Sequence, residues 1–387
     1  MLALARPLPA EEVSLYAAAG RTLAEDVIAT RNQPPFTASA MDGWAVRAAD
    51  AVAGARLTIA GESAAGRGHT DDVGPGQAVR IFTGAPVPPG ADAVVIQENT
   101  IRDGDQVIVN EAAAPRANLR PEGGDFRAGD GLLKAGVRLD PWRVSLAAAA
   151  GRATLFVARK PKVAILSTGD EIVLPGTAPG PHQIYNSGAP ALAVLVERWG
   201  GDPVLLTPAG DTLAAIADPV RDQACDVLVT IGGASVGDHD LVKPALSTLG
   251  LTLAFESLKM RPGKPTSFGT LGDGRYVLGL PGNPASALVC AELFLRPLLA
   301  ALQGGDPALP MSTARIASPL PANGPREHWM RARLSSADGV VTATPFGDQD
   351  SSLITVFASA DALVRRPCDA PAADAGGVVE VLKLERL

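Results

Sequence analysis

The part of the sequence that most restricts the fold lies between Pro161 and Leu302, where short apolar runs alternate with stretches of helical pattern. The expected strands are Val163–Leu166, Val204–Thr207 and Asp226–Ile231, with two more near Leu253 and Tyr276, and the expected helices are Pro190–Trp199, Leu213–Ala224, Asp240–Leu249 and one from Ala285. Strands and helices at this spacing predict a mostly parallel sheet with helices on both faces. Ligands of such sheets bind at the loops that follow the carboxyl ends of the strands.

The regions on either side of this α/β segment have a different pattern. A chain of 387 residues exceeds what one hydrophobic core usually supports, so several domains are expected. The beginning of the chain predicts one helical segment over Ala10–Ile28. Short β-rich runs separated by Gly, Pro and Asp follow from Trp44 to Val137, and similar runs return from Ala314 to the end. Both patterns are typical of small β domains.

Composition and charge argue against several classes of protein. A net charge of −7 is unfavourable for a general nucleic-acid binder, because such proteins displace counterions from phosphates with a basic surface. The long apolar stretch Ala285–Leu302 is interrupted by two charged residues and a proline, so no membrane span is expected. The first residues lack a signal-peptide pattern, and the three cysteines lie far apart, which predicts free thiols in a cytoplasmic protein.

The first predicted ligand loop runs from Ser167 through Thr168 and Gly169 to Asp170 and Glu171, directly after an apolar strand. Hydroxyl and backbone N–H groups suit an anion, and two adjacent carboxylates suit a divalent cation. The alternative is an ordinary turn with solvated acids.

The second predicted loop begins with Gly232 and Gly233 and continues through Ser235 to Asp238 and Asp240. Glycines allow the backbone to approach a phosphate, and the expected helix would turn its first amides toward it. Loops of this kind are common between a strand and a helix, so this one alone indicates only a phosphate or a nucleotide.

The third predicted loop contains Pro281, Gly282, Asn283, Pro284 and Ser286 and precedes the long expected helix. Asn283 is suited to cap that helix and Pro284 to occupy its first position, which explains part of the pattern structurally. The remaining part is a serine beside an exposed helix start, which indicates an oxyanion site.

A dense cationic segment, Lys259–Pro265, precedes this third loop and carries Arg261 and Lys264. Its prolines restrict the backbone. In an acidic protein this segment is the expected place for a dianion or a pyrophosphate. The competing interpretation is a solvent-exposed basic loop.

The stretch Pro34–Arg47, with Met41-Asp42-Gly43 at its centre, resembles the signature of the MoeA family, whose eukaryotic relatives include the E domain of gephyrin. The later motifs that resemble this family, in the same order, are Thr83–Pro86, Glu122–Gly129, Ser167–Glu171, Gly232–Asp240, Arg261–Pro265 and Pro281–Ser286. The resemblance extends from about Pro7 to the end of the chain. Arg261 stands where many relatives have lysine, and Asp350 stands beside Ser351 where the family tends to glycine.

The resemblance implies a multi-domain α/β plus β fold with four parts. An N-terminal dimerisation domain, helical and extended, would comprise residues 1–46 and 130–159, and a small β-rich domain would be inserted at 47–129. A molybdopterin-binding α/β domain would follow at 160–306, and a small C-terminal β domain at 307–387. Two such subunits would form a homodimer with the active site at the subunit interface.

The activity that the resemblance implies is insertion of molybdate into adenylylated molybdopterin, with Mg²⁺-dependent release of AMP. The implied catalytic residues are Asp42, Thr83, Asp125, Glu171, Asp238, Asp240 and Lys264. The expected substrate-binding residues are Ser167, Thr168, Gly169, Gly232, Gly233, Ser235, Pro281, Gly282, Asn283 and Pro284. The expected molybdate ligands are Arg261, Lys264, Ser286, Arg331 and Ser351, and the expected Mg²⁺ ligands are Asp170, Glu171, Asp238 and Asp240.

Two other functions remain open from the sequence. The enzyme that adenylylates molybdopterin resembles only residues 160–305, so the Met-Asp-Gly region and the C-terminal β region favour the transferase. Contact between the two enzymes is a further expectation about partners. The other alternative is a scaffold, because gephyrin relatives also bind receptor segments.

Overall fold

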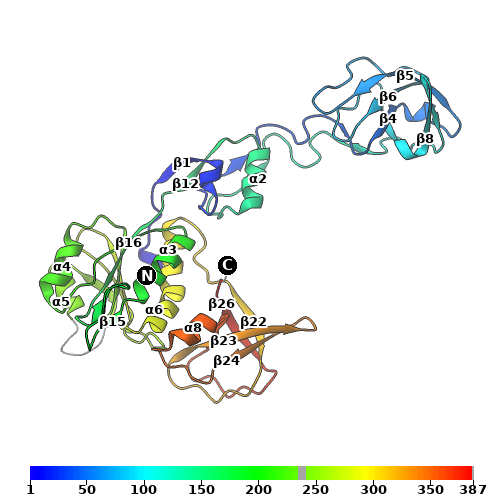
Figure 1. Ribbon diagram of the computed structural model, residues 1–387. Helices are drawn as coiled ribbons and strands as arrows, with labels where there is room; N and C mark the ends of the chain where they lie inside the picture. Colours follow the sequence, from blue (N-terminus) through cyan, green and yellow to red (C-terminus); the bar gives the residue numbers. More distant parts are fainter. Residues whose placement is uncertain (234–240, 386–387) are drawn as a thin grey trace.

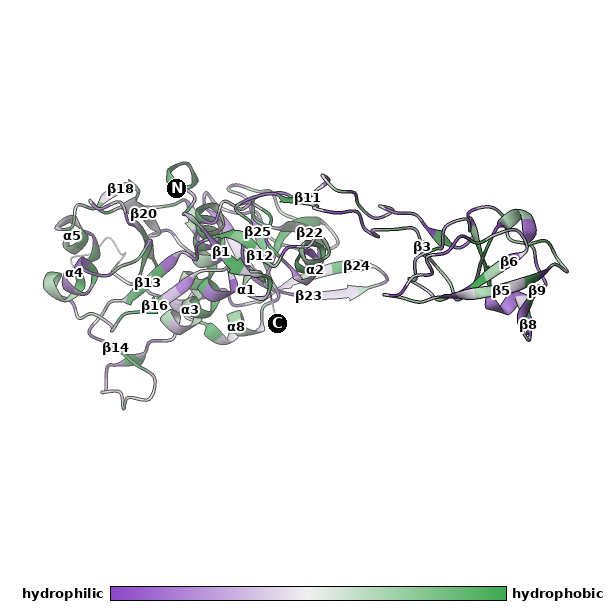
Figure 2. Ribbon diagram, turned by 90° about the horizontal axis from the view of Figure 1, so that it is seen from above, coloured by the Kyte–Doolittle hydropathy of each residue, from purple (hydrophilic) through white to green (hydrophobic). Residues whose placement is uncertain are grey.

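The computed structural model of the chain describes residues 1–233 and 241–385 and is elongated (Figure 1). A small unit built on β1 (Ala10–Ser14), β12 (Thr154–Ala158) and α2 (Pro141–Ala149) lies between a β module at one end and two larger sheets at the other. Figure 2, the view from above, shows the same separation of the β module from the α/β sheet.

The unit around β1 and β12 differs from the single helix predicted over Ala10–Ile28, and that prediction is wrong. Strand β1 pairs antiparallel with β12, and only α1 (Leu15–Ala18) is helical. Ser14 caps α1 by accepting a hydrogen bond from the Ala17 N–H at 3.3 Å, and the chain turns away at Gly20, whose φ is +75°. Pairing with a strand from a distant part of the chain overrides local helix propensity here. The remaining pair in this unit is β2 (Val27–Ile28) with β11 (Gly131–Leu133).

The β module is a six-stranded sheet in the order β7-β4-β6-β5-β9-β8. Its elements are β4 (Gly43–Val46), η2 (Ala48–Asp50), β5 (Arg56–Ser63), β6 (Gln77–Ile81), β7 (Ala93–Ile96), η3 (Gln97–Asn99), β8 (Thr100–Asp103) and β9 (Gln106–Val109). Strand β4 is buried along its whole length between β6 and β7. The module therefore begins before the boundary expected at residue 47, because the apolar run Gly43–Val46 finds partners on both sides. The short pair β3 (Ala38–Ser39) and β10 (Leu119–Arg120) joins the module to the rest of the chain.

The α/β sheet confirms the expected fold class, with strands in the order β16-β13-β17-β21-β20-β18. These strands are β13 (Lys162–Ser167), β16 (Asp202–Leu205), β17 (Val227–Ile231), β18 (Thr252–Phe255), β20 (Ser267–Thr270) and β21 (Tyr276–Leu280). The first four in the order are parallel, and β20 and β18 are antiparallel to their neighbours. The carboxyl ends of β13, β17 and β21 therefore meet at one edge of the sheet.

Helices cover both faces of this sheet, as expected. The helices are α3 (Gly188–Arg198), α4 (Leu213–Arg221), α5 (Val242–Ser247), α6 (Pro284–Cys290), the π-helical η4 (Ala291–Leu295) and α7 (Arg296–Leu302). Alternate side chains of β13 point to opposite faces: Val163 and Ile165 pack with α3, α6 and α7, whereas Ala164 and Leu166 pack with α4 and α5. The helix expected from Asp240 begins at Val242 within the described residues, and Asp240 itself lies outside them.

The long helix Pro284–Leu302 is apolar enough to cross a membrane by length and composition, but 78% of that stretch is buried inside the structure. It packs into the core of the α/β sheet, as the central helix of a globular domain does. At the N-terminus, η1 (Leu2–Leu4) contacts α7.

The C-terminal sheet has the order β19-β23-β24-β22-β26-β25, and β23 also pairs with β25, so the sheet closes on itself. Its elements are β22 (Met311–Ile316), β23 (Glu327–Ala337), β24 (Val340–Pro345), α8 (Ile354–Ser359), β25 (Ala362–Arg366) and β26 (Val378–Lys383). The sixth strand, β19 (Met260–Arg261), comes from the α/β part of the chain and pairs in parallel with β23, Arg261 opposite His328.

Truncation of a fully buried strand residue tests this packing. Leu228 of β17 is 0% exposed, so Leu228→Ala should lower the free energy of unfolding by about 3 kcal/mol through lost burial and a residual cavity. Leu205 of β16 is 52% exposed, and Leu205→Ala should change it by less than about 0.5 kcal/mol. Urea denaturation of both variants measures the difference, and equal losses would contradict the assigned burial.

Candidate functional site

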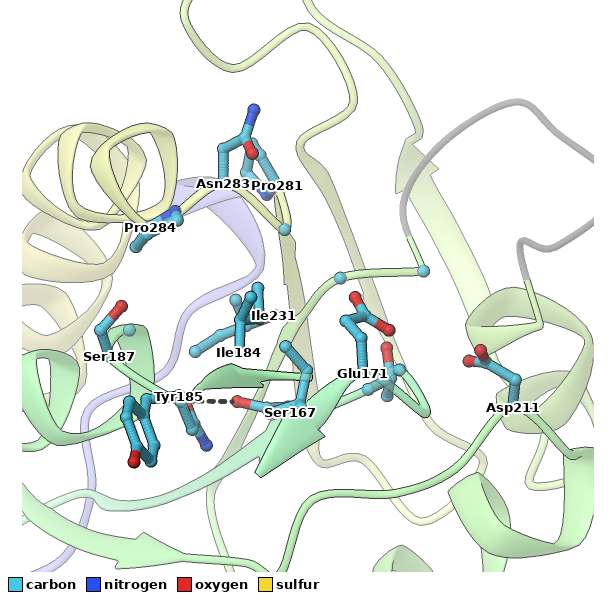
Figure 3. A pocket seen from close by; sticks show the side chains of 18 of the residues that line it. Ser167, Glu171, Ile184, Tyr185, Ser187, Asp211, Ile231, Pro281, Asn283 and Pro284 are labelled. Atoms are coloured by element: carbon cyan, nitrogen blue, oxygen red, sulfur yellow. Dashed lines mark hydrogen bonds between the residues drawn. The ribbon is translucent and has the colours of Figure 1, made fainter. Parts of the chain in front are cut away.

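A cavity of about 660 Å³ opens at the carboxyl ends of β13, β17 and β21 (Figure 3). The predicted substrate-binding residues that line it are Ser167, Thr168, Gly169, Gly232, Gly233, Pro281, Gly282, Asn283 and Pro284. The tenth, Ser235, lies outside the described residues, as do Asp238 and Asp240. The structure thus brings together three loops, the first and last of which are separated by more than a hundred residues of sequence.

Close backbone contacts hold these loops together. Gly232 has a φ of +95°, and a Cβ added there would lie 2.8 Å from the carbonyl oxygen of Thr168. The Thr168 N–H in turn donates to the Ile231 carbonyl at 3.0 Å. Only glycine allows the second loop to pass so near the first.

Two carboxylates line one end of the cavity, Glu171 and Asp211, and Figure 3 shows both there. Asp211 follows β16 and was not among the predicted site residues, although an acid after a strand of this sheet is the available signal. Asp170 does not line the cavity. Its Oδ1 accepts from the Asp211 N–H at 3.1 Å, so it fixes the loop that carries Asp211.

A second cavity, of about 290 Å³, adjoins the first, because Pro265, Pro281 and Asn283 line both. Four of the five predicted molybdate residues line the smaller cavity: Arg261, Lys264, Ser286 and Ser351. The pairing of β19 with β23 brings the cationic segment to this position between the two larger sheets.

The fifth predicted molybdate residue, Arg331, is 1% exposed and does not line either cavity. Its Nε donates to Gln349 Oε1 at 3.2 Å, and its Nη1 donates to the Asp350 carbonyl at 2.9 Å. Arg331 therefore supports the loop that carries Ser351. Another arginine of the same segment, Arg326, lines the smaller cavity.

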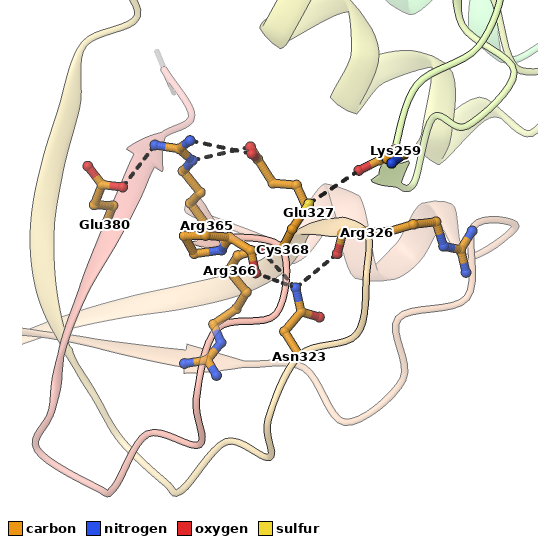
Figure 4. Close-up of polar contacts among 9 residues, drawn as sticks. Lys259, Asn323, Arg326, Glu327, Arg365, Arg366, Cys368 and Glu380 are labelled. Atoms are coloured by element: carbon orange, nitrogen blue, oxygen red, sulfur yellow. Dashed lines mark hydrogen bonds and ion pairs between the residues drawn. The ribbon is translucent and has the colours of Figure 1, made fainter.

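The backbone around Arg326 is fixed by side-chain contacts (Figure 4). Asn323 Nδ2 donates to the Arg326 carbonyl at 2.9 Å, and Arg365 forms an ion pair with Glu327 at 3.2 Å. Figure 4 shows the Arg326 side chain pointing away from these contacts. The guanidinium of Arg326, which directly precedes β23, is thus held at the rim of the smaller cavity.

Asn283 links the α/β part to the C-terminal sheet. It occupies the capping position of α6 without a capping hydrogen bond, and its Nδ2 instead donates to Ser351 Oγ at 2.7 Å. The neighbouring Asp350 is held by the hydroxyl of Ser352 at 2.6 Å and by its backbone N–H, and these bonds lower the pKa of Asp350. The ionised carboxylate of Asp350 therefore lies at the rim of the smaller cavity, and its Oδ1 accepts hydrogen bonds from Ser352.

The electrostatics of the smaller cavity are visible in His328, which lies opposite Arg261. Burial, together with the positive charges of Arg261, Arg331, Arg326 and Arg366, lowers its pKa to about 4. Four guanidiniums thus act on one imidazole, and their positive charge favours an anion in this region.

The remaining predicted residues lie away from both cavities of the same chain. Asp42 Oδ1 accepts from the Thr83 N–H at 2.7 Å and from its hydroxyl at 2.8 Å, and both bonds lower the pKa of Asp42. This pair belongs to the β module, which Figures 1 and 2 show apart from the α/β sheet. Asp125 lies in the connection to the module, where its N–H donates to the Gln33 carbonyl at 2.9 Å.

Comparison with known proteins gives matches along most of the chain. Residues 1–151 match the MoeA N-terminal region (domain I and II), residues 164–301 a probable molybdopterin binding domain, and residues 313–384 the MoeA C-terminal region (domain IV). A molybdopterin molybdenumtransferase of Nostoc sp. is 36% identical, over 97% of this chain and 88% of the relative. The chain belongs to the MoeA family.

Other members of the MoeA family agree with this assignment. A relative from Mycobacterium tuberculosis, molybdopterin molybdenumtransferase 2, is 36% identical over 99% of this chain and 96% of its own length. A crystal structure of the molybdopterin biosynthesis MoeA protein from Pyrococcus horikoshii OT3 superposes with a TM-score of 0.85 at 27% identity, covering 99% of this chain and 97% of that one. The predicted family, fold class and transferase class are confirmed.

The low pKa of His328 predicts a specific acid sensitivity of this MoeA family member. The folded-state pKa of about 4 lies below the ordinary value of about 6.5, so between these pH values the unfolded chain binds more protons. Stability should therefore fall as the pH falls through this window. In His328→Gln the loss between pH 6.5 and 4.5 should be smaller by about 2 kcal/mol, as measured by urea unfolding.

A matched control for this measurement is His182→Gln, because His182 is exposed. It should keep the acid sensitivity of the unchanged protein. If His328→Gln loses stability on acidification as steeply as the control does, the cationic environment of His328 is not what the structure indicates.

Proposed function

We propose that this chain inserts molybdate into adenylylated molybdopterin, with Mg²⁺-dependent release of AMP, in molybdenum cofactor biosynthesis. The observation that carries the proposal is the junction of two cavities at Pro265, Pro281 and Asn283. One has glycine-rich loops and hydroxyls suited to phosphates, and the other has a cluster of cations suited to a small dianion. The names of the relatives, molybdopterin molybdenumtransferases, support the molybdenum-transfer part of this proposal.

The smaller cavity is the proposed molybdate site. Molybdate is a tetrahedral dianion that needs charged and hydroxyl donors, and Arg261, Lys264, Ser286 and Ser351 supply these groups. Arg331 does not line this cavity and instead holds the Ser351 loop through the Asp350 carbonyl. Direct contact between Arg331 and molybdate would require that loop to shift.

The larger cavity is the proposed site of the adenylylated pterin, with its pyrophosphate near Glu171. No group of three metal-binding side chains occurs within residues 1–233 and 241–385, but Glu171 and Asp211 line the same end of the cavity. Two carboxylates fit Mg²⁺, because this ion is commonly held by one or two carboxylates together with phosphate oxygens and waters. Among the described residues the proposed ligands are Glu171 and Asp211, with Asp170 supporting the latter. When bound, Mg²⁺ would neutralise charge on the pyrophosphate.

The chain's own contribution is positioning and charge stabilisation. None of the described residues that line the two cavities is a cysteine or a histidine, so covalent catalysis by these groups has no support there. Lys264 and Arg261 would hold molybdate beside the dithiolate, and the adjoining loops would hold the phosphates. Asp238 and Asp240 remain proposed metal ligands and lie outside the described part of the chain.

A second subunit is the proposed source of Asp42, Thr83 and Asp125. The first two belong to the β module, which Figures 1 and 2 show apart from the α/β sheet, and Asp125 lies in the connection to that module. An exposed apolar surface is available for dimerisation on the contacting helices α1 and α2, where Tyr16 is 94% and Trp142 is 82% exposed. Large exposed aromatic side chains of this kind are typical of interfaces.

Release of AMP tests the reaction. The protein with adenylylated molybdopterin and Mg²⁺ should form AMP rapidly only when molybdate is added. Lys264→Ala should reduce this molybdate-dependent rate on the order of a hundredfold, because it removes a donor to the anion. Lys160→Ala, which removes an exposed lysine outside both cavities, should leave it unchanged. Consumption of ATP with free molybdopterin would instead support the adenylylating enzyme.

Mixing two inactive variants tests the shared active site. Asp42→Ala and Lys264→Ala each damage one half of the proposed site, so a mixed dimer contains one site with both halves intact. If subunits exchange at random, half of the dimers are mixed, and each mixed dimer has one intact site out of two. About one quarter of the activity of the unchanged protein should therefore return. Trp142→Glu in both variants should abolish the recovery and yield monomers in sedimentation. No recovery by variants that do exchange subunits would place the whole site within one chain.

A further inference from the structure

We propose that the end of the larger cavity formed by Tyr185 and Asn186 binds the pterin ring of the substrate, with Tyr185 as a stacking surface and Asn186 as a hydrogen-bond donor. This inference rests on the proposed function, since it assigns one part of that substrate to one part of the cavity.

The apolar wall comes from β14 (Ile172–Val173) and β15 (Ile184–Tyr185), which pair in parallel beside the first loop. Ile172, Ile184, Tyr185 and Ile231 all line the cavity. Ile184 is 59% and Tyr185 48% exposed, so these large side chains present apolar surface that the protein itself leaves uncovered. A flat heteroaromatic ring can cover such a surface by stacking.

The amide of Asn186 has an orientation fixed by its neighbours. Asn186 is 5% exposed, and its Oδ1 accepts from the Ser167 hydroxyl and from the Ala189 N–H, both at 3.2 Å. Because these two donors require an oxygen at this position, the NH₂ group of Asn186 lies on the other side of the amide. Asn186 lines the cavity, and its Nδ2 has no hydrogen bond to another residue among those described. A nearly buried amide thus offers a free N–H donor to a ligand that carries an acceptor, such as the carbonyl oxygen of a pterin.

The order of groups in the substrate favours the pterin over the adenine at this end. In adenylylated molybdopterin the dithiolene lies between the pterin and the pyrophosphate. Figure 3 shows Tyr185 and Ser187 at one end of the cavity and Glu171 and Asp211 at the other. With the phosphates at the acids and the sulfurs at the junction with the molybdate cavity, the pterin falls on Tyr185 and the adenosine lies beyond the acids.

Binding of a free pterin tests this assignment without any turnover. The probe is 6-hydroxymethylpterin, whose own fluorescence should be quenched on binding to the complete chain. Tyr185→Ala should weaken this binding at least tenfold, whereas Tyr185→Phe should keep it, because stacking needs only the ring. Asn186→Asp keeps the acceptor for Ser167 and Ala189 but loses the donor, and should also weaken binding about tenfold. AMP, titrated in parallel, should bind equally to all four proteins.

The outcomes separate this inference from the proposed function. A loss of AMP affinity in Tyr185→Ala with unchanged pterin affinity would assign this end of the cavity to the adenine and overturn the inference. The inference would also be overturned if the unchanged protein did not quench the fluorescence of the pterin. If pterin binding follows the expected pattern but AMP release does not depend on molybdate, the ring site holds and the proposed reaction fails.

Discussion

The site depends on one backbone pairing, the two-residue strand β19 laid parallel to β23. This pairing places the cationic segment Lys259–Pro265, which leaves the α/β sheet, at the edge of the C-terminal sheet. Arg261 therefore faces the C-terminal β structure while Lys264 and Pro265 return to the α/β loops. The hydrogen bond from Asn283 to Ser351 closes the same junction from the other side. These two connections add to the packing of Trp329 and Leu363 against the α/β core and set the cation cluster beside the glycine-rich loops.

The α/β part and its loops were predictable because their signals are local. Apolar runs with glycine or acid residues directly after them mark strand ends, and parallel strands bring those ends to one edge whatever the details of packing. Gly232 and Pro281 accordingly line one cavity although the sequence alone shows no contact between them. The family resemblance then supplied the activity, which spacing alone left at a phosphate or a nucleotide.

The sequence was less informative where a residue's role depends on distant partners. Strand β1 has helix-compatible residues and becomes a strand only because β12 offers hydrogen bonds to it. Arg331 and Arg326 lie on one short segment. Arg331 donates hydrogen bonds to Gln349 and to the Asp350 carbonyl, and it is Arg326 that lines the cavity. Asp211 follows a short edge strand with a weak apolar signal. Tertiary packing determines the roles of these residues, and a local sequence pattern carries no information about it.

The connection to the β module is double, and this has a mechanical consequence. The outgoing and returning segments are cross-linked, since Asn32 Nδ2 donates to Glu122 Oε1 at 2.6 Å and the Gly123 N–H donates to the Pro34 carbonyl at 2.9 Å. Two connected segments leave fewer orientations open to the module than a single flexible linker does, because fewer backbone conformations satisfy both of them. The module that carries the Asp42 and Thr83 pair is therefore restricted in orientation relative to the rest of its own chain. If two subunits share the site as proposed, less conformational freedom is lost when this module docks on its neighbour.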